Sequence, residues 1–255
     1  MYEKGFPGCL LFERESYFYY QASNLFRNIT DNASIDFSPF IPKAYNTMEV
    51  ASLDQNQNLE EEPLILENLC AKGFEFCTNS MSCFDLPHAE LTLDLYGKFH
   101  AMGMMFHETK VDNDEIANKL FRLNIISIFM ENEVHTHNFE EGMRMFINWM
   151  EGKADYNDSC ERLKSLLNNQ RYQEIALDLF KQGAEHEMQV IQHGNARWSN
   201  ILFKYDENKT SPSEVKIVDF QQLCYFVPFY DIGYFLALDL PASILIENFR
   251  QLVGR

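Results

Sequence analysis

The chain has 255 residues, 46% of them hydrophobic, so it is long enough to bury a sizeable core as one large domain or two lobes. Its 21 Lys and Arg residues stand against 38 Asp and Glu residues, a formal net charge of −17, which disfavours nucleic acid and anionic membrane surfaces as partners because phosphate binding needs clustered cations. The chain opens on no secretion signal and has no apolar run of about 18 residues, so a cytoplasmic protein is expected.

The first 69 residues combine a helix signal with one short apolar strand. An α-helix is predicted near Leu11–Phe26 and a strand at Leu64–Leu66. The polar stretch Asp54–Glu62 between them indicates an exposed turn or loop.

Helix signals dominate after residue 69. Apolar residues recur at spacings of three and four, which predicts amphipathic helices with one buried stripe each. The stripes are Leu91, Leu95, Phe99, Met102 and Phe106; Met143, Phe146, Ile147 and Met150; and Leu163, Leu166 and Leu167. They are expected to form core and do not indicate a cofactor. A further apolar helix is expected after Pro241.

Two segments near the C-terminus indicate chemistry. Asn200 opens the apolar strand Ile201–Phe203, and Asp219 follows a second apolar strand, Val215–Val218, with a turn predicted at Asp206–Ser213 between them. Such a hairpin would bring the amide and the carboxylate side by side at one end. Both groups offer the oxygen ligands that Mg²⁺ prefers when it is bound to a nucleotide triphosphate and takes waters and phosphates as its other ligands.

These segments resemble the loops of a known group of kinases. His193-Gly194 with Asn200, and Val218-Asp219-Phe220-Gln221, are similar to the catalytic and metal-binding loops of the aminoglycoside phosphotransferase and choline kinase group. The likeness is strongest to the ecdysteroid kinase-like branch, also called CHK kinase-like, whose metal-binding loop typically reads Val-Asp-Phe-Gln. Further segments resemble the family in the same order: Leu10–Tyr19, Pro63–Leu69 with Gly73-Phe74, and Leu95–Ala101. The resemblance covers nearly the whole chain.

The resemblance implies a fold, a reaction and cofactors. The fold is α+β, a two-lobed protein-kinase-like fold with an incomplete N-lobe at residues 1–69 and a mostly helical C-lobe at residues 70–255 that carries the catalytic-loop hairpin. The reaction is transfer of the γ-phosphoryl group of ATP, with Mg²⁺, to a hydroxyl group of a small-molecule acceptor such as an ecdysteroid or choline.

The resemblance also implies roles for individual residues. Asn200 and Asp219 would hold Mg²⁺ and form the catalytic set with Asn195, and Glu15 corresponds to the helix residue that pairs with the nucleotide-binding Lys. The hinge residues, whose backbone would meet the adenine, are Leu66, Glu67, Asn68 and Leu69. The Glu67 side chain is expected to face solvent.

One position departs from the family in a way that affects the reaction. Asn195 stands where the family has the catalytic Asp, and an amide cannot accept the proton of the attacking hydroxyl group. General-base assistance contributes about 10²–10⁴ in rate, but positioning and metal electrostatics carry most of phosphoryl transfer. Slow transfer is therefore one hypothesis. The other is a catalytically impaired pseudokinase or a truncated fragment, since the N-lobe strand with the phosphate-binding Lys is also expected to be missing.

Several candidates have simpler structural roles. His193 is expected to hydrogen-bond backbone in a tight turn, whereas the place of Asp219 at the end of a strand favours ligand contact over a turn cap. Glu15 could be a solvated acid on a helix face. His135 and His137 could face a metal, but metal sites need three or four ligands, and a solvent-exposed loop is expected instead.

Overall fold

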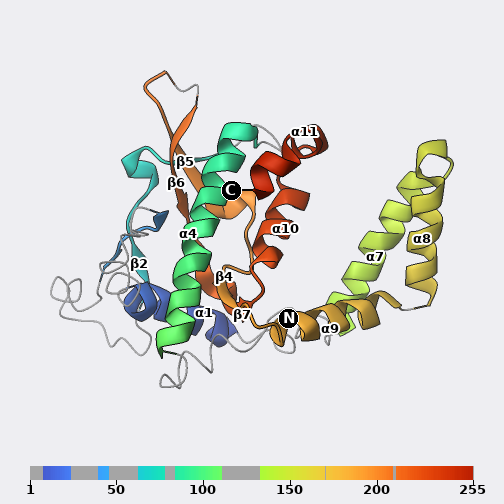
Figure 1. Cartoon of the computed structure of the whole chain (residues 1–255), viewed down its shortest axis with the longest axis horizontal. Coiled ribbons are helices and arrows are strands. Elements are labelled where there is room, and N and C mark those ends of the chain that lie inside the picture. Colours follow the sequence, from blue (N-terminus) through green and yellow to red (C-terminus); the bar gives the residue numbers. More distant parts are fainter. Residues whose placement is uncertain are drawn as a thin grey trace. The chain divides into compact units, whose positions relative to one another are not determined.

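The computed structural model describes residues 8–23, 40–45, 63–77, 84–110, 133–169, 171–208 and 211–254. The chain forms two compact units (Figure 1). The helical unit consists of Met1–Pro7 and Leu123–Glu187, and the site unit of Gly8–Arg122 and Met188–Arg255. The predicted lobe boundary after residue 69 stays a prediction. No helix within the described ranges is both long and apolar enough to span a membrane.

The described part of the helical unit is built from α-helices. They are α7 (Glu133–Met150), α8 (Asn157–Asn168) and α9 (Arg171–Ala184), with a 3₁₀ turn at Ala154–Tyr156. Its core consists of Ile147, Met150, Cys160, Leu167 and Tyr172. Two of the predicted apolar stripes therefore meet each other here, because α7 packs against α8.

Two expectations for the helical unit are wrong. Phe146 is 52% exposed and stacks on Trp149 with 5.7 Å between the ring centroids, so it lies outside the buried stripe. It precedes the buried Ile147 by one residue, which turns its side chain about 100° around the helix. Residues 135–137 lie in α7 rather than in a loop. No glycine or proline interrupts this part of the helix, so its first turn extends through them.

The helices of the site unit begin with α1 (Gly8–Tyr17), which continues as a π-helical turn at Phe18–Ala22. The predicted N-terminal helix is thereby confirmed as far as the described residues reach. The other helices are α4 (Leu86–Lys110), α10 (Phe229–Leu238) and α11 (Ala242–Val253). The last of these is the helix predicted after Pro241.

Helix α4 is the central helix of the site unit. Its predicted stripe has no exposed surface at Leu95, Phe99 and Met102. Gly103 faces strand β4 (Val190–Gln192), and a Cβ atom at this position would lie 2.6 Å from the backbone nitrogen of Ile191. Glycine therefore lets the helix and the strand approach closely.

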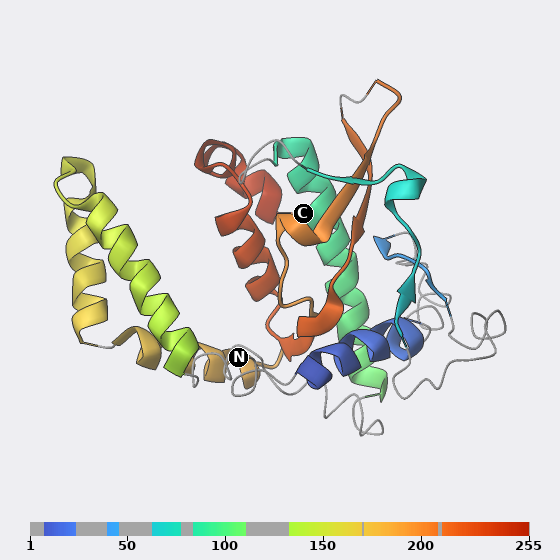
Figure 2. The ribbon, with the colours of Figure 1, turned by 180° about the vertical axis from the view of Figure 1, so that it is seen from behind.

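The strands form small antiparallel sheets, so the site unit combines helix and sheet. The pairs are β1 (Ala44–Tyr45) with β2 (Ile65–Leu66), and β4 with β7 (Cys224–Phe226); the third sheet has the order β3 (Glu75–Phe76), β5 (Ile201–Tyr205), β6 (Pro212–Ile217). The predicted hairpin is β5–β6, which runs beside α4 in both views (Figure 2). Its turn is shorter than predicted because Pro212 and Ser213 belong to β6.

Aromatic side chains fill the space between these sheets and helices. The largest of them with less than 2% exposure are Phe18, Phe84, Tyr96, Phe99, Phe203, Phe220 and Phe235. Of these, Phe220 directly follows the predicted metal ligand Asp219. The core of the unit therefore reaches the candidate site.

Candidate functional site

The β5–β6 hairpin ends where the two predicted metal ligands meet. Ile201 pairs with Ile217, and the Val218 N–H donates to the Asn200 carbonyl oxygen at 3.0 Å. This last bond places Asp219 beside Asn200, so that Asn200 Nδ2 donates to Asp219 Oδ2 at 3.0 Å. The predicted juxtaposition of the amide and the carboxylate is confirmed.

The hydrogen bonds of Asn200 fix the direction of its amide. Nδ2 carries two hydrogens and has two acceptors, Asp219 Oδ2 and the carbonyl oxygen of Asn195, each at 3.0 Å. The amide oxygen Oδ1 consequently points away from these acceptors, and it accepts a long bond of 3.5 Å from the Ser199 hydroxyl group. The amide and the carboxylate thus lie at the same end of the hairpin, with the amide N–H groups directed at Asp219 Oδ2 and the Asn195 carbonyl oxygen.

The backbone of Asp219 has an unusual conformation. Among the described residues it is the one non-glycine residue with positive φ, at φ 73° and ψ 60°. A left-handed conformation costs a non-glycine residue about 1–2 kcal/mol, so the neighbours of Asp219 must hold it. The Phe220 ring that follows is buried and stacks on Phe18 with 3.8 Å between the centroids.

His193 has the structural role predicted for it. Its Nε2 lies 2.9 Å from the Val218 carbonyl oxygen, which can only accept, so Nε2 carries the hydrogen. Its Nδ1 accepts from the Asn195 N–H at 3.3 Å, so both ring nitrogens are used by a neutral imidazole. Burial lowers the pKa of His193, which is consistent with this neutral form. The histidine therefore ties the predicted catalytic loop to the hairpin.

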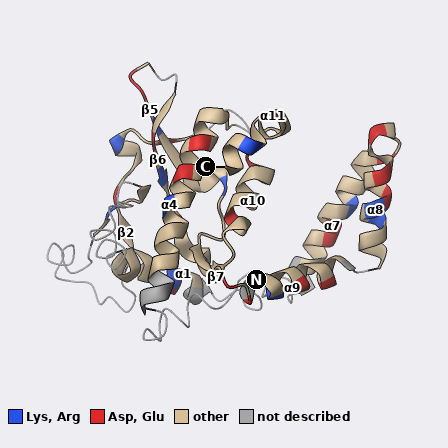
Figure 3. Cartoon of the chain, in the orientation of Figure 1, with Lys and Arg blue, Asp and Glu red and all other residues tan. Residues whose placement is uncertain are grey.

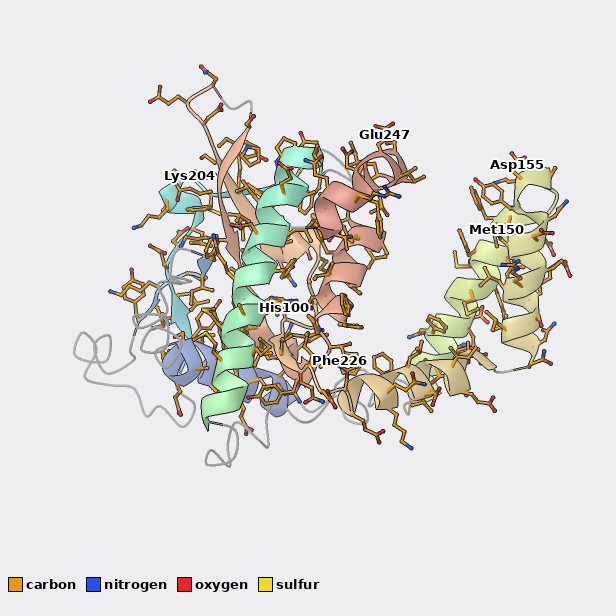
Figure 4. The ribbon with its side chains drawn as sticks, viewed as in Figure 1. His100, Met150, Asp155, Lys204, Phe226 and Glu247 are labelled. Atoms are coloured by element: carbon orange, nitrogen blue, oxygen red, sulfur yellow. The ribbon has the colours of Figure 1, made fainter. Side chains whose placement is uncertain are left out.

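Asp231 anchors the same loop, a role that the sequence did not predict. Its carboxylate, with no exposed surface, accepts the N–H groups of His193 at 2.7 Å and Gly194 at 2.9 Å and contacts Nε2 of His100 at 3.1 Å. His100 lies on α4 and points toward the centre of the unit (Figure 4). The sequence feature that could have indicated this role is an acidic residue in the first turn of α10, a helix that is otherwise mostly apolar.

Gly194 is required by the geometry of this loop. Its φ is +77°, and a Cβ atom would lie 2.3 Å from the carbonyl oxygen of Gln222. Both the conformation and the close approach exclude a larger residue without movement of the backbone.

The Asn195 side chain points at the predicted metal-binding loop. Its Nδ2 donates to Asp219 Oδ2 at 3.2 Å, the same oxygen that accepts from Asn200. The side chain therefore acts as a hydrogen-bond donor in this structure. This agrees with the expectation that an amide at this position does not serve as a general base.

Glu15 lies against the turn that carries Asp219. Glu15 Oε1 accepts the Phe220 N–H at 3.3 Å. Burial and then the charge of Asp219 raise the pKa of Glu15 from 4.5 to about 7, although the Phe220 N–H opposes this change. The structure thus places Glu15 beside the predicted metal ligand, and no ion pair of Glu15 occurs within the described ranges.

The residues of the predicted hinge lie at the end of strand β2 and in the turn that follows it. Leu66 pairs with Ala44 of β1, and the Glu67 N–H donates to the Lys43 carbonyl oxygen at 2.8 Å. The Asn68 side chain accepts the Ala71 N–H at 3.1 Å. These bonds hold the hinge backbone in a defined shape.

Leu69 joins the hinge to the hairpin. Its carbonyl oxygen accepts the N–H groups of Lys72 at 3.0 Å and Phe74 at 3.1 Å, so it is already used within the turn. Its side chain is buried with Phe74 and Leu202, and Val218 packs against them. The hinge therefore lies over β5 and β6 one residue before Asp219.

The expectation that Glu67 faces solvent is wrong. Its side chain is 15% exposed and forms an ion pair of 3.0 Å with Lys72. The hydrogen bond from Lys72 lowers the pKa of Glu67. Lys72 follows Glu67 across a tight turn, which brings the opposite charges together.

A buried acid lies next to the end of the predicted catalytic loop. Asp239 is 1% exposed, and among the described residues its carboxyl oxygens accept no hydrogen bond of regular geometry. Burial raises its pKa from 3.8 to about 6, and the backbone of Trp198 and the charge of Arg197 offset this effect only in part.

The residues present fit a magnesium ion held jointly with a nucleotide. Within the described part of the chain, no three His, Cys, Asp or Glu side chains gather into a metal site of their own. Mg²⁺ usually binds proteins through one or two carboxylates and takes phosphates and waters as its other ligands, so Asn200 and Asp219 suffice.

The negative charge of the chain is not confined to the site. Asp and Glu lie on helices of both units (Figure 3), so the charge is spread along the chain.

The mixed helix and sheet, together with the paired His-Gly and Asp-Phe loops, are consistent with a protein of the kinase-like class. The chain belongs to the ecdysteroid kinase-like family, whose sequence model matches residues 3–255. A search of curated proteins found no match to it. Family membership indicates a kinase-like phosphotransferase. The roles predicted for the individual site residues stay predictions.

Proposed function

We propose that this protein binds ATP with Mg²⁺ at Asn200 and Asp219 and is a phosphotransferase for a hydroxyl group of a small molecule. The observation that carries the proposal is the 3.0 Å bond between these side chains, with the amide oxygen of Asn200 turned away from its two acceptors. The proposal includes a two-lobed fold, in which the hinge residues Leu66–Leu69 meet the adenine. Mg²⁺, when bound, would offset the charge of the phosphates.

This chain's own residues would orient the ligands. Asp219 is half-buried and so can be reached from solvent, whereas Asn200 is 7% exposed. The buried bonds from His193 and Gly194 to Asp231 keep the catalytic loop in place without using the side chain of Asn195. Asn195 would orient the acceptor hydroxyl group by a hydrogen bond.

The bond from Asn195 to Asp219 favours a second candidate function, a pseudokinase that binds nucleotide without efficient transfer. Residue 195 is a donor to the metal-binding carboxylate rather than an acceptor for a proton. Loss of a general base typically costs about 10²–10⁴ in rate. Both candidates share the nucleotide site and differ in turnover.

Thermal unfolding with ATP tests the shared site. A ligand that binds only the folded chain raises its Tm. We expect ATP with Mg²⁺ to raise the Tm of the wild type and not that of Asp219→Ala. Glu214→Ala is the matched control, because it removes an acid from the same hairpin whose side chain is 53% exposed. No shift in the wild type with saturating ATP and Mg²⁺ would overturn the proposal.

ADP release by the wild type separates the two candidates. Release that depends on a hydroxyl acceptor supports the slow phosphotransferase, and its absence in a wild type that still binds ATP with Mg²⁺ supports the pseudokinase. Asn195→Asp tests the role of residue 195: restoring the base should increase ADP release measurably, and unchanged release from a variant that still binds ATP with Mg²⁺ would contradict that role.

A further inference from the structure

Helix α1 and its π-helical turn contact the metal-binding turn at three points. Glu15 Oε1 accepts the Phe220 N–H at 3.3 Å. Phe18 stacks on the Phe220 ring at 3.8 Å between centroids, and Tyr19 meets that ring edge-on at 5.5 Å. Residues three and four apart share one face of a helix. A single helical face therefore holds both the backbone and the side chain of Phe220.

This attachment bears directly on the Asp219 carboxylate. The direction of the Phe220 N–H is set by the ψ angle of Asp219, so a bond to this N–H fixes the peptide plane between the two residues. Asp219 is left-handed, with φ 73°, a conformation that a non-glycine residue keeps only when its surroundings impose it. Relaxation of Asp219 requires its φ angle to change, and because the Val218 N–H is bonded to Asn200, this change would turn the Asp219 side chain relative to Asn200 and would displace Phe220. Contacts that hold Phe220 in place therefore oppose it.

We propose that Glu15 is a positioning residue: its carboxyl group holds the Asp219–Phe220 peptide and thereby keeps the Asp219 carboxylate facing Asn200. The consequence for ligand binding rests on the proposed function. This role differs from the ion pair with a lysine that the family resemblance implies, because it requires an acceptor oxygen and no negative charge. Glutamine supplies the oxygen without the charge, and alanine supplies neither.

Amide hydrogen exchange tests the positioning without any nucleotide. The Phe220 N–H should exchange at least tenfold faster in Glu15→Ala than in the wild type, and Glu15→Gln should keep its protection. Glu13→Ala, which removes an exposed acid of the same helix, should leave it unchanged. Unchanged protection in Glu15→Ala overturns the proposal. So does equal acceleration of the core amides of α4, which would indicate general destabilisation, or a Glu15→Gln variant that exchanges like Glu15→Ala.

ATP affinity measured with and without Mg²⁺ tests the consequence. Because the proposed effect passes through Asp219, Glu15→Ala should bind ATP about tenfold more weakly than the wild type when Mg²⁺ is present. Without Mg²⁺ the two should bind ATP equally. The double variant with Asp219→Ala should bind as weakly as Asp219→Ala alone. Equal losses with and without Mg²⁺ contradict the positioning role. A wild type that binds no ATP with Mg²⁺ refutes the proposed function, and hydrogen exchange then decides the role of Glu15.

Discussion

Replacing Asp239 by asparagine should change how stability depends on pH. The folded chain binds the Asp239 proton more tightly than the unfolded chain, since burial raises the pKa from 3.8 to about 6. The ionised carboxylate therefore lowers the free energy of unfolding by its full amount above about pH 6, and the protonated group does not lower it below about pH 4. The raised pKa corresponds to a penalty of about 3 kcal/mol. Wild-type stability should fall by this amount as the pH rises through that window, and Asp239→Asn should lack this loss.

Urea unfolding at pH values from about 4 to about 7.5 measures this effect. The chain has 2 Trp residues, so a Trp149→Phe background leaves Trp198, beside Asp239, as the reporter of the site unit. The stability of Asp239→Asn relative to its parent should grow by about 3 kcal/mol over this range. Asp94→Asn alters a partly exposed acid of α4 and serves as the control. Parallel pH curves for Asp239→Asn and its parent would refute the reasoning.

Two further substitutions test the anchoring of the catalytic loop by thermal and urea unfolding. Gly194→Ala should lower the free energy of unfolding by about 2 kcal/mol or more, because its Cβ atom would lie 2.3 Å from the Gln222 carbonyl oxygen and its φ is +77°. Gly142 lies in helix α7, and a Cβ atom there would meet nothing within 4 Å. Gly142→Ala should therefore raise the free energy of unfolding by up to about 1 kcal/mol. Equal effects of these two would contradict the steric explanation. Asp231→Asn should cost at least about 2 kcal/mol, because it weakens bonds to two buried N–H groups and to His100. A stability equal to that of the wild type would show that these bonds do not anchor the loop.

Local patterns in the sequence predicted the elements that depend on near neighbours. The period of three and four identified the buried side of α4, and the polar ends of two apolar strands identified the β5–β6 hairpin. The meeting of Asn200 and Asp219 follows from that hairpin, because antiparallel pairing brings residues 19 positions apart together. The part of the site formed by neighbouring strands could therefore be predicted.

Contacts between distant segments could not be predicted in the same way. Asp231 accepts the N–H of Gly194 37 positions earlier, and Glu15 accepts the N–H of Phe220 205 positions later. A backbone N–H is the same in nearly every residue, so such bonds leave no trace in composition or periodicity. Phe146 shows a second limit of sequence patterns. The spacing of apolar residues predicted the helix correctly, but it did not show how wide the buried face is, so the exposed Phe146 was assigned to that face.

Calorimetric titration of the wild type and Asp219→Ala with ATP, in Mg²⁺ and in EDTA, tests the paired oxygen ligands most directly. We expect ATP to bind the wild type in Mg²⁺ and to lose most of its affinity in EDTA or when residue 219 is alanine. Binding that is the same in all four combinations would show that Asn200 and Asp219 do not hold a nucleotide-bound cation.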